Sequence, residues 1–143
     1  MIEGARDEPG AAADLLIVED DEEIAALMEL ILTEEGHRVR VARDGEQGLA
    51  ALSEALPELI LLDAEMPLLD GPGMADRMFV HNLGMENIPV VIVSAASQLS
   101  AIAARVGTPY FLPKPFYPDD LLSLTARALR ERQVPRPGLA TSR

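Results

Sequence analysis

Four short apolar runs, each ending at a polar or charged residue, constrain this chain more than any other feature of its sequence. They cover residues 15–18, 59–62, 90–93 and 110–113. Unbroken runs of leucine and β-branched residues of this length are typical of strands buried on both faces, as in a parallel sheet. Ligands of open α/β sheets bind outside the carboxyl ends of the strands. The residues that directly follow the four runs are therefore the candidate site.

Carboxylates, a hydroxyl and an ammonium occupy those positions. In chain order they are Glu19, Asp20, Asp63, Ser94 and Lys114. Two like charges about 5 Å apart cost on the order of 3 kcal/mol at an effective dielectric near 20, so clustered carboxylates are unfavourable by themselves. A hard divalent cation makes the cluster favourable, and oxygen ligands with room for water suit Mg²⁺.

The lysine and the serine extend this interpretation beyond a metal site. An anion that coordinates the metal, accepts a hydrogen bond from Ser94 and pairs with Lys114 is most simply a phosphoryl group. Asp63 is the carboxylate best placed to attack phosphorus and form an acyl phosphate. The bland alternative for Glu19 and Asp20 is that they only cap the helix that follows, where acids suit the helix dipole.

Helical periodicity between the runs predicts alternating strands and helices. The predicted helices contain residues 24–31, 49–56, 74–83, 99–106 and 118–129. The alternation of polar and apolar residues over 38–41 predicts an edge strand. Five such units favour an open, doubly wound, five-stranded parallel sheet of order 2-1-3-4-5, because a closed barrel needs eight.

The length of 143 residues fits one domain, and a hydrophobic content of 48% suffices for its core. We expect the domain to cover residues 14–132, with flexible tails at 1–13 and 133–143, the second being equally the start of a linker. The chain has no cysteine, which excludes thiol chemistry. Without a signal-peptide pattern or an apolar run of about 20 residues, a cytoplasmic protein with no membrane contact is expected.

The net charge of −12 argues against direct binding to nucleic acid, which requires a basic face. An acidic protein instead suits a divalent cation or a basic partner, although the excess charge could serve solubility alone. The two histidines, His37 and His81, are expected at the surface or at an edge without a functional role.

The segments 15–20, 63–71, 93–95 and 114–116 read LLIVED, DAEMPLLDG, VSA and KPF. In this order and spacing they resemble the receiver domain of bacterial two-component response regulators, over about residues 14–132. The resemblance implies a flavodoxin-like (βα)5 fold and a signalling switch with Asp63 as phosphoacceptor. It implies no enzyme beyond self-phosphorylation from small donors and autodephosphorylation.

The resemblance also implies roles for the other site residues. Asp20 and Asp63 would bind Mg²⁺ with the backbone carbonyl of Glu65, and Glu19 would act mostly through water. Ser94 would contact the phosphoryl group and shift toward it, and Lys114 would bind one of its oxygens.

Two further features follow from the same resemblance. Phe111, three residues before Lys114, falls where the family has a rotating aromatic that reports activation, and the Lys114–Pro115 bond is usually cis. Residues 107–110 depart from the usual Gly-Ala segment, and Glu65 and Ala96 occupy positions that often tune dephosphorylation.

The expected partners are a histidine kinase or phosphotransfer protein as donor and an unknown output protein at the face near residues 97–130. No DNA-binding segment follows, so output is expected through protein contacts or a domain missing from this chain. The alternatives are a non-phosphorylated scaffold, a phosphatase that uses an aspartyl phosphate, and a nucleotide- or flavin-binding module. The phosphatase would need an aspartate where Glu65 stands, and the nucleotide module a glycine-rich loop where residues 19–21 are acidic.

Overall fold

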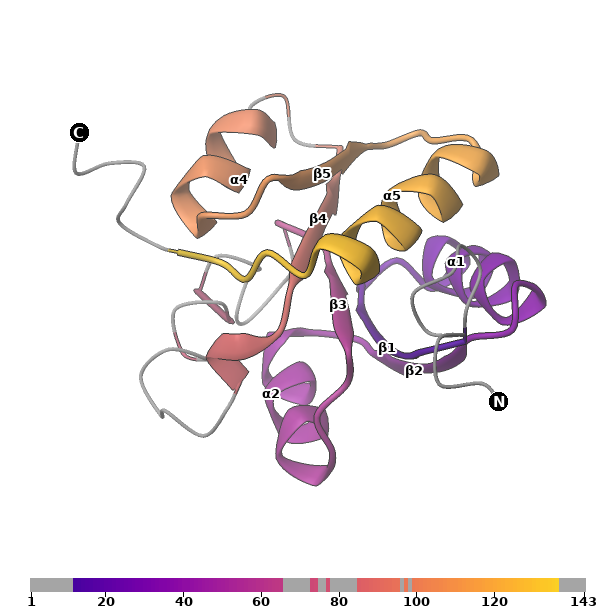
Figure 1. Ribbon diagram of the computed structural model, residues 1–143, viewed down its shortest axis with the longest axis horizontal. Helices are drawn as coiled ribbons and strands as arrows, with labels where there is room; N and C mark the ends of the chain where they lie inside the picture. The colour runs from indigo at the N-terminus through magenta and orange to yellow at the C-terminus, as the bar shows by residue number, and fades with distance from the viewer. Residues whose placement is uncertain are drawn as a thin grey trace.

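The computed structural model describes residues 12–65, 73–74, 77, 85–95, 97 and 99–136. They form one parallel sheet of order β2-β1-β3-β4-β5, flanked by helices (Figure 1), as predicted. The strands are β1 (Asp14–Val18), β2 (Arg38–Ala42), β3 (Leu59–Leu62), β4 (Val90–Ser94) and β5 (Tyr110–Pro113). The helices are α1 (Glu22–Glu34), α2 (Gly45–Glu54), α4 (Leu99–Val106) and α5 (Pro118–Glu131), with a short 3-10 helix η2 (Met85–Asn87).

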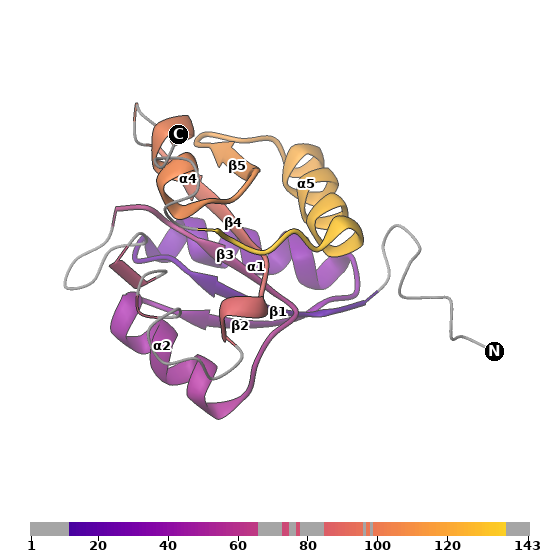
Figure 2. The same cartoon turned by 60° about the vertical axis from the view of Figure 1, so that its left-hand side comes forward.

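The central strands are buried on both faces because successive side chains pack against different helices. In β1, Leu15 and Ile17 belong to the core shared with α1 and α5, whereas Leu16 and Val18 belong to the core shared with α2 and α4. Figures 1 and 2 show these helix pairs around the sheet. Both faces therefore require apolar residues, which explains the unbroken runs.

The edge strand β5 differs from this pattern. Tyr110 and Leu112 are buried, whereas Phe111 and Pro113 are exposed. The prediction that this run is buried on both faces is wrong, because β5 is the last strand of the sheet and has a paired neighbour on one side only. At the opposite edge lies β2, where the alternating sequence predicted an edge strand.

Asp21 begins α1. Its carboxylate accepts hydrogen bonds from the backbone N–H groups of Glu23 and Ile24, at 3.0 and 3.1 Å. The helix ends before Gly36, whose φ of +105° favours glycine. Since the N-cap is Asp21, the two preceding acids do not fill that position.

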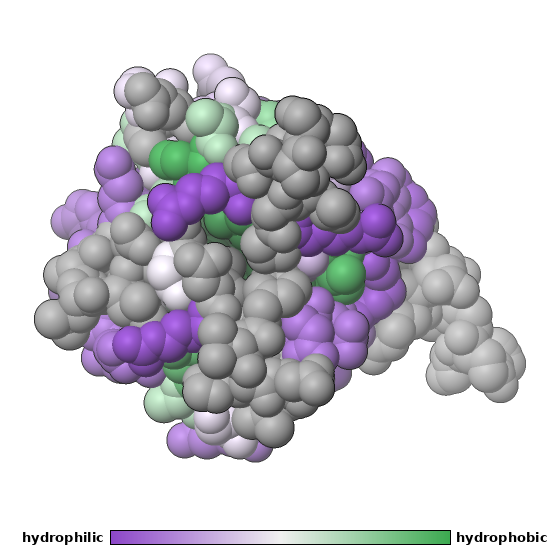
Figure 3. All heavy atoms as spheres, turned by 90° about the vertical axis from the view of Figure 1, so that its left-hand side faces the viewer, coloured by the Kyte–Doolittle hydropathy of each residue, from purple (hydrophilic) through white to green (hydrophobic). Residues whose placement is uncertain are grey.

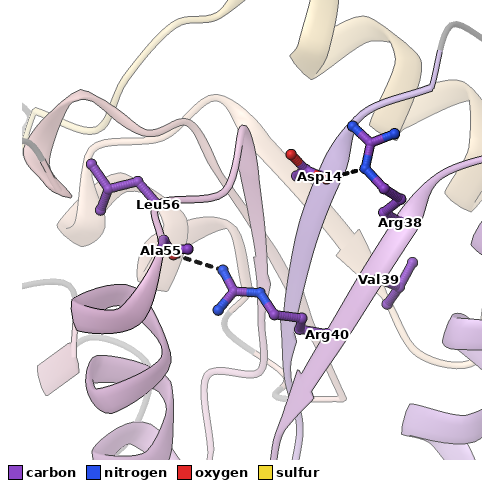
Figure 4. Close-up of a pocket in the computed structure, with 6 residues that line it drawn as sticks. All are labelled: Asp14, Arg38, Val39, Arg40, Ala55 and Leu56. Atoms are coloured by element: carbon purple, nitrogen blue, oxygen red, sulfur yellow. Dashed lines mark hydrogen bonds and ion pairs between the residues drawn. The ribbon is translucent and has the colours of Figure 1, made fainter.

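Arg40 ties the edge strand β2 to α2. Its guanidinium donates to the carbonyls of Ala51 and Ala55, at 3.0 and 2.7 Å, and so holds the end of α2 against the strand. Figure 4 shows Arg40 reaching Ala55 across a pocket of about 300 Å³, next to the ion pair of Arg38 and Asp14. This pocket lies where β1 and β2 begin, at the opposite end of the sheet from the candidate site.

Part of the predicted structure lies outside the described residues. Of the helix predicted over 74–83, only Met74 and Arg77 are described. His81, Ala96 and the segment 66–72 lie outside, and the domain boundaries stay predictions. Within the described residues, no helix has both the length and the apolar character needed to cross a membrane. On the face in Figure 3, the described hydrophobic side chains form separate small patches among hydrophilic ones.

His37 is buried, contrary to expectation, with 6% of its surface exposed. Its Nδ1 accepts a hydrogen bond from the backbone N–H of Ala13 at 3.1 Å, so the ring is neutral with its proton on Nε2. Burial lowers the pKa of His37, although the nearby carboxylates of Glu35 and Glu58 act in the opposite direction. His37 therefore binds the backbone of Ala13, just before β1, only while its ring is uncharged.

We expect the contribution of His37 to the free energy of unfolding to fall as the pH drops below about 6.5. Because the pKa of His37 is lower in the folded state, its contribution is complete above the unfolded pKa and is lost as pH falls through the folded pKa. His37→Asn keeps an acceptor near the Ala13 N–H, and asparagine does not titrate. Between pH 7.5 and pH 5, the wild type should therefore lose about 1 kcal/mol more free energy of unfolding than the variant, as measured by urea melts. Equal losses in both proteins would contradict this role.

Candidate functional site

Three carboxylates meet where β1 and β3 end. One oxygen each of Glu19, Asp20 and Asp63 lies within 4.8 Å of the others. The backbone N–H of Glu19 donates to the carbonyl of Ala42 at 3.0 Å, and that of Asp63 to the carbonyl of Val18 at 2.9 Å. The parallel register therefore continues past the strands and brings their acidic ends together, as their spacing predicted.

Lys114 approaches this cluster from the end of β5. Its Nζ lies 2.7 Å from Oε1 of Glu19 and 3.5 Å from Oδ2 of Asp63. Its backbone N–H donates to the carbonyl of Ser94 at 3.0 Å, which fixes where the side chain starts. The Lys114–Pro115 bond is cis, as the resemblance implies.

Burial changes the acid–base behaviour of the pair. It raises the pKa of Glu19 to about 7, against the opposing effects of Lys114 and of the Asp21 N–H group. Burial alone would lower the pKa of Lys114, but its contacts with Glu19 and Asp63 raise it above the ordinary value. Lys114 is therefore a cation at neutral pH, whereas Glu19 exchanges its proton there.

The donor set fits a hard divalent cation. The three clustered side chains offer only carboxylate oxygens, the ligands that Mg²⁺ prefers. One oxygen of Asp63 already has a partner, because the backbone N–H of Glu65 donates to Oδ1 at 3.2 Å. Asp20 is exposed, which leaves a side open to water and to a ligand.

The remaining predicted residues lie on the last two strands. Ser94 ends β4 and is buried, with 1% of its surface exposed. Phe111 lies in the middle of β5 beside Ile92, with 41% of its surface exposed. The structure thus joins Glu19, Asp20, Asp63 and Lys114 in one cluster, links Ser94 to it through the backbone of Lys114, and places Phe111 outside it.

Arg43 is a site neighbour that our sequence analysis missed. Its Nη2 donates to the backbone carbonyl of Asp20 at 3.1 Å, and its Nη1 lies 4.0 Å from a carboxylate oxygen of Glu22. Arg43 therefore anchors the loop that carries Asp20. It follows β2 directly, so the same strand-end reasoning could have found it.

Our sequence analysis also missed the structural role of Thr108, which lies in the segment 107–110 at the other end of the sheet. Its hydroxyl is buried, donates to the carbonyl of Val90 at 2.5 Å and accepts from the N–H of Tyr110 at 3.1 Å. One side chain thus joins the beginnings of β4 and β5. A buried threonine beside a strand gives no sequence signal that separates it from a surface one.

Comparison with known proteins identifies relatives over most of the chain. The family model described as the response regulator receiver domain matches residues 15–126. The nitrogen assimilation regulatory protein NtrX of Azorhizobium caulinodans is 34% identical over 129 residues, which cover 87% of this chain and 28% of the relative. The response regulator MprA of Mycolicibacterium vanbaalenii is 30% identical over 130 residues, covering 90% and 54%.

Solved structures agree with this match. A putative response regulator from Chloroflexus aurantiacus is 32% identical, with a TM-score of 0.76 over 82% of this chain and 98% of that one. The receiver domain of NtrX from Brucella abortus is 34% identical, with a TM-score of 0.73 over 81% and 98%.

The chain spans 28% and 54% of the two curated relatives named above. The residues that match the family model contain the acidic cluster and Lys114. The chain belongs to the family of response regulator receiver domains.

Proposed function

We propose that this chain is a phosphorylation-activated switch that accepts a phosphoryl group on Asp63 with Mg²⁺. Receiver domains of response regulators are phosphorylation-dependent signalling domains and generally not classical enzymes. The observation that carries the proposal is the setting of Asp63, whose Oδ1 accepts from the Glu65 N–H while Oδ2 lies 3.5 Å from Lys114 Nζ. One oxygen is held by the backbone, and the other faces a cation.

Asp20, Asp63 and the backbone carbonyl of Glu65 would hold Mg²⁺, with Glu19 acting mostly through water. The bound ion would neutralise charge on the oxygens of the transferred group. A carboxylate oxygen of Asp63 attacks phosphorus, and the bond from phosphorus to the donor's histidine nitrogen breaks. Lys114 stabilises the negative charge of the new acyl phosphate.

The donor would be a histidine kinase or phosphotransfer protein, the partners of receiver domains. Ser94 would shift toward the phosphoryl group, and the exposed ring of Phe111 would reorient. These two changes would alter contacts with an output protein at the face near residues 97–130. Ser94 ends β4 and Phe111 lies in the middle of the neighbouring strand β5, so the two changes would act on adjacent strands.

The alternatives have less support. A non-phosphorylated scaffold has no need for three clustered carboxylates facing one buried lysine. A phosphatase acid would stand at Glu65, whose side chain is exposed and whose backbone N–H already binds the acceptor. The acidic loop after β1 does not suit a nucleotide phosphate.

Asp63→Asn should abolish phosphorylation without unfolding the protein. After incubation with Mg²⁺ and acetyl phosphate, mass spectrometry should find one added phosphoryl group on Asp63, and none in the variant. Asp44→Asn is the matched control, because Asp44 caps α2 outside the cluster and asparagine caps equally well. Labelling that persists in Asp63→Asn would refute the assignment. If the wild type binds Mg²⁺ but takes no label, the scaffold or a donor-restricted receiver is favoured.

Asp20→Asn should stabilise the metal-free protein and weaken Mg²⁺ binding. Lys114 forms its ion pairs with Glu19 and Asp63, so the charge of Asp20 has less compensation. Removing that charge should raise the free energy of unfolding by about 1 kcal/mol, or Tm by about 3 °C. Thermal melts with and without Mg²⁺ measure both effects, again against Asp44→Asn. A variant whose melting temperature responds to Mg²⁺ as the wild type does would contradict the metal role.

Mg²⁺ binding should weaken as the pH falls from 8 to 6. Burial raises the pKa of Glu19 to about 7, so the metal-free site takes up a proton over this range and the ion must displace it. Titration calorimetry should show about a tenfold loss of affinity. Glu19→Gln cannot take up the proton, and its affinity should change little with pH. An equal pH dependence in the variant would assign the effect to another group.

A further inference from the structure

The chain turns after α5 and passes the beginning of β5. Arg132 closes the helix in the left-handed conformation, with φ of +53°, and its N–H donates to the carbonyl of Ala128 at 2.8 Å. The following residues, 133–136, run from α5 toward α4 across the beginnings of β4 and β5 (Figure 1). We call residues 133–136 the strap.

Two hydrogen bonds fix the ends of the strap. The backbone N–H of Gln133 donates to the hydroxyl of Tyr110 at 3.2 Å, and that of Arg136 donates to the carbonyl of Gly107 at 3.0 Å. Pro135 is buried between them. A hollow of about 360 Å³ remains under the strap beside Pro109, so the attachment is concentrated at these points.

The close approach of the strap requires a glycine at position 107. A Cβ atom at this position would lie 2.3 Å from the carbonyl carbon of Arg136, closer than real Cβ contacts allow. Its φ of +87° also favours glycine. Gly36 has a similar φ of +105°, but a Cβ there would meet nothing within 4 Å. The strap therefore adds a requirement for glycine that backbone conformation alone does not explain.

Tyr110 provides a rigid anchor at the other end. Its ring is fully buried, and its hydroxyl donates to Glu131 at 3.1 Å while accepting from Gln133. Arg127 lies over the ring, 5.3 Å from its centre, and pairs with Glu131. Because these contacts hold the hydroxyl in place, a movement of β5 relative to the strap would break its hydrogen bond with Gln133.

We propose that the surface formed by Gly107, Pro109 and Tyr110 is a docking surface for the strap, and that docking is coupled to the phosphoacceptor site through β5. Tyr110 begins this four-residue strand, and Lys114 directly follows its end. Hydrogen bonds to β4 hold the strand as one unit. The coupling rests on the function proposed above: drawing Lys114 toward a phosphoryl group displaces Tyr110 from Gln133 and loosens the strap.

Hydrogen exchange of the Gln133 and Arg136 amides, measured by NMR on the full chain, tests docking. Gly107→Ala should lower the protection of both amides about tenfold, the loss expected for two hydrogen bonds. Gly36→Ala introduces similar backbone strain without a clash, and should leave both within about twofold. Equal losses in the two variants would overturn docking. If Gly107→Ala does not fold, Tyr110→Phe decides, because it keeps the ring and should expose the Gln133 amide. Unchanged protection there would also overturn docking.

Beryllofluoride with Mg²⁺, a phosphoryl mimic, tests the coupling in the wild type. It should lower protection of both amides about fivefold, the lower end of typical coupling. In Lys114→Met, which removes the ammonium, the mimic should leave the protection of both amides unchanged, and a loss equal to that of the wild type would overturn coupling through Lys114. Bound mimic with unchanged protection would overturn the coupling while the proposed function stands. If the mimic does not bind, the proposed function fails and the coupling that rests on it fails as well, whereas docking of the strap is decided by Gly107→Ala and Tyr110→Phe.

Discussion

The repulsion among clustered carboxylates, and the one ammonium that offsets it, set the terms for the rest of this molecule. Lys114 lies 2.7 Å from Glu19 and 3.5 Å from Asp63, yet three acids share the cluster. Such an arrangement persists only where the surrounding structure over-determines it. The parallel register does so here, because hydrogen bonds past the ends of β1 and β3 leave neither Glu19 nor Asp63 free to move away.

This imbalance is also what makes the site responsive. A fully neutralised cluster would gain little from a cation, whereas one with excess negative charge gains much. The flanking residues serve the same end. Arg43 holds the backbone of Asp20, and the Glu65 N–H holds one oxygen of Asp63, so few groups need to rearrange when a ligand arrives.

The order of the sheet and the acidic cluster could be predicted from the sequence, because both depend on the order of residues along the chain. Apolar runs mark the strands, and the residue after each run must lie at the common edge. Prediction from the sequence failed where the burial of a residue depends on contacts between segments that lie far apart in the chain. Phe111 and Pro113 are exposed because β5 is an edge strand, and His37 is buried because it accepts from Ala13, 24 residues away. The periodicity of apolar residues along the chain predicts neither the exposure of β5 nor the burial of His37.

The strap shows the same division most clearly. The proline and polar residues of the strap favour a loose tail, yet each attachment is a backbone N–H whose partner lies more than 20 residues earlier in the chain. Both partners border β5, the strand whose far end delivers Lys114 to the acids. All four residues of β5 pair with β4. The charge imbalance at one end and the docked strap at the other therefore act on the same four-residue strand.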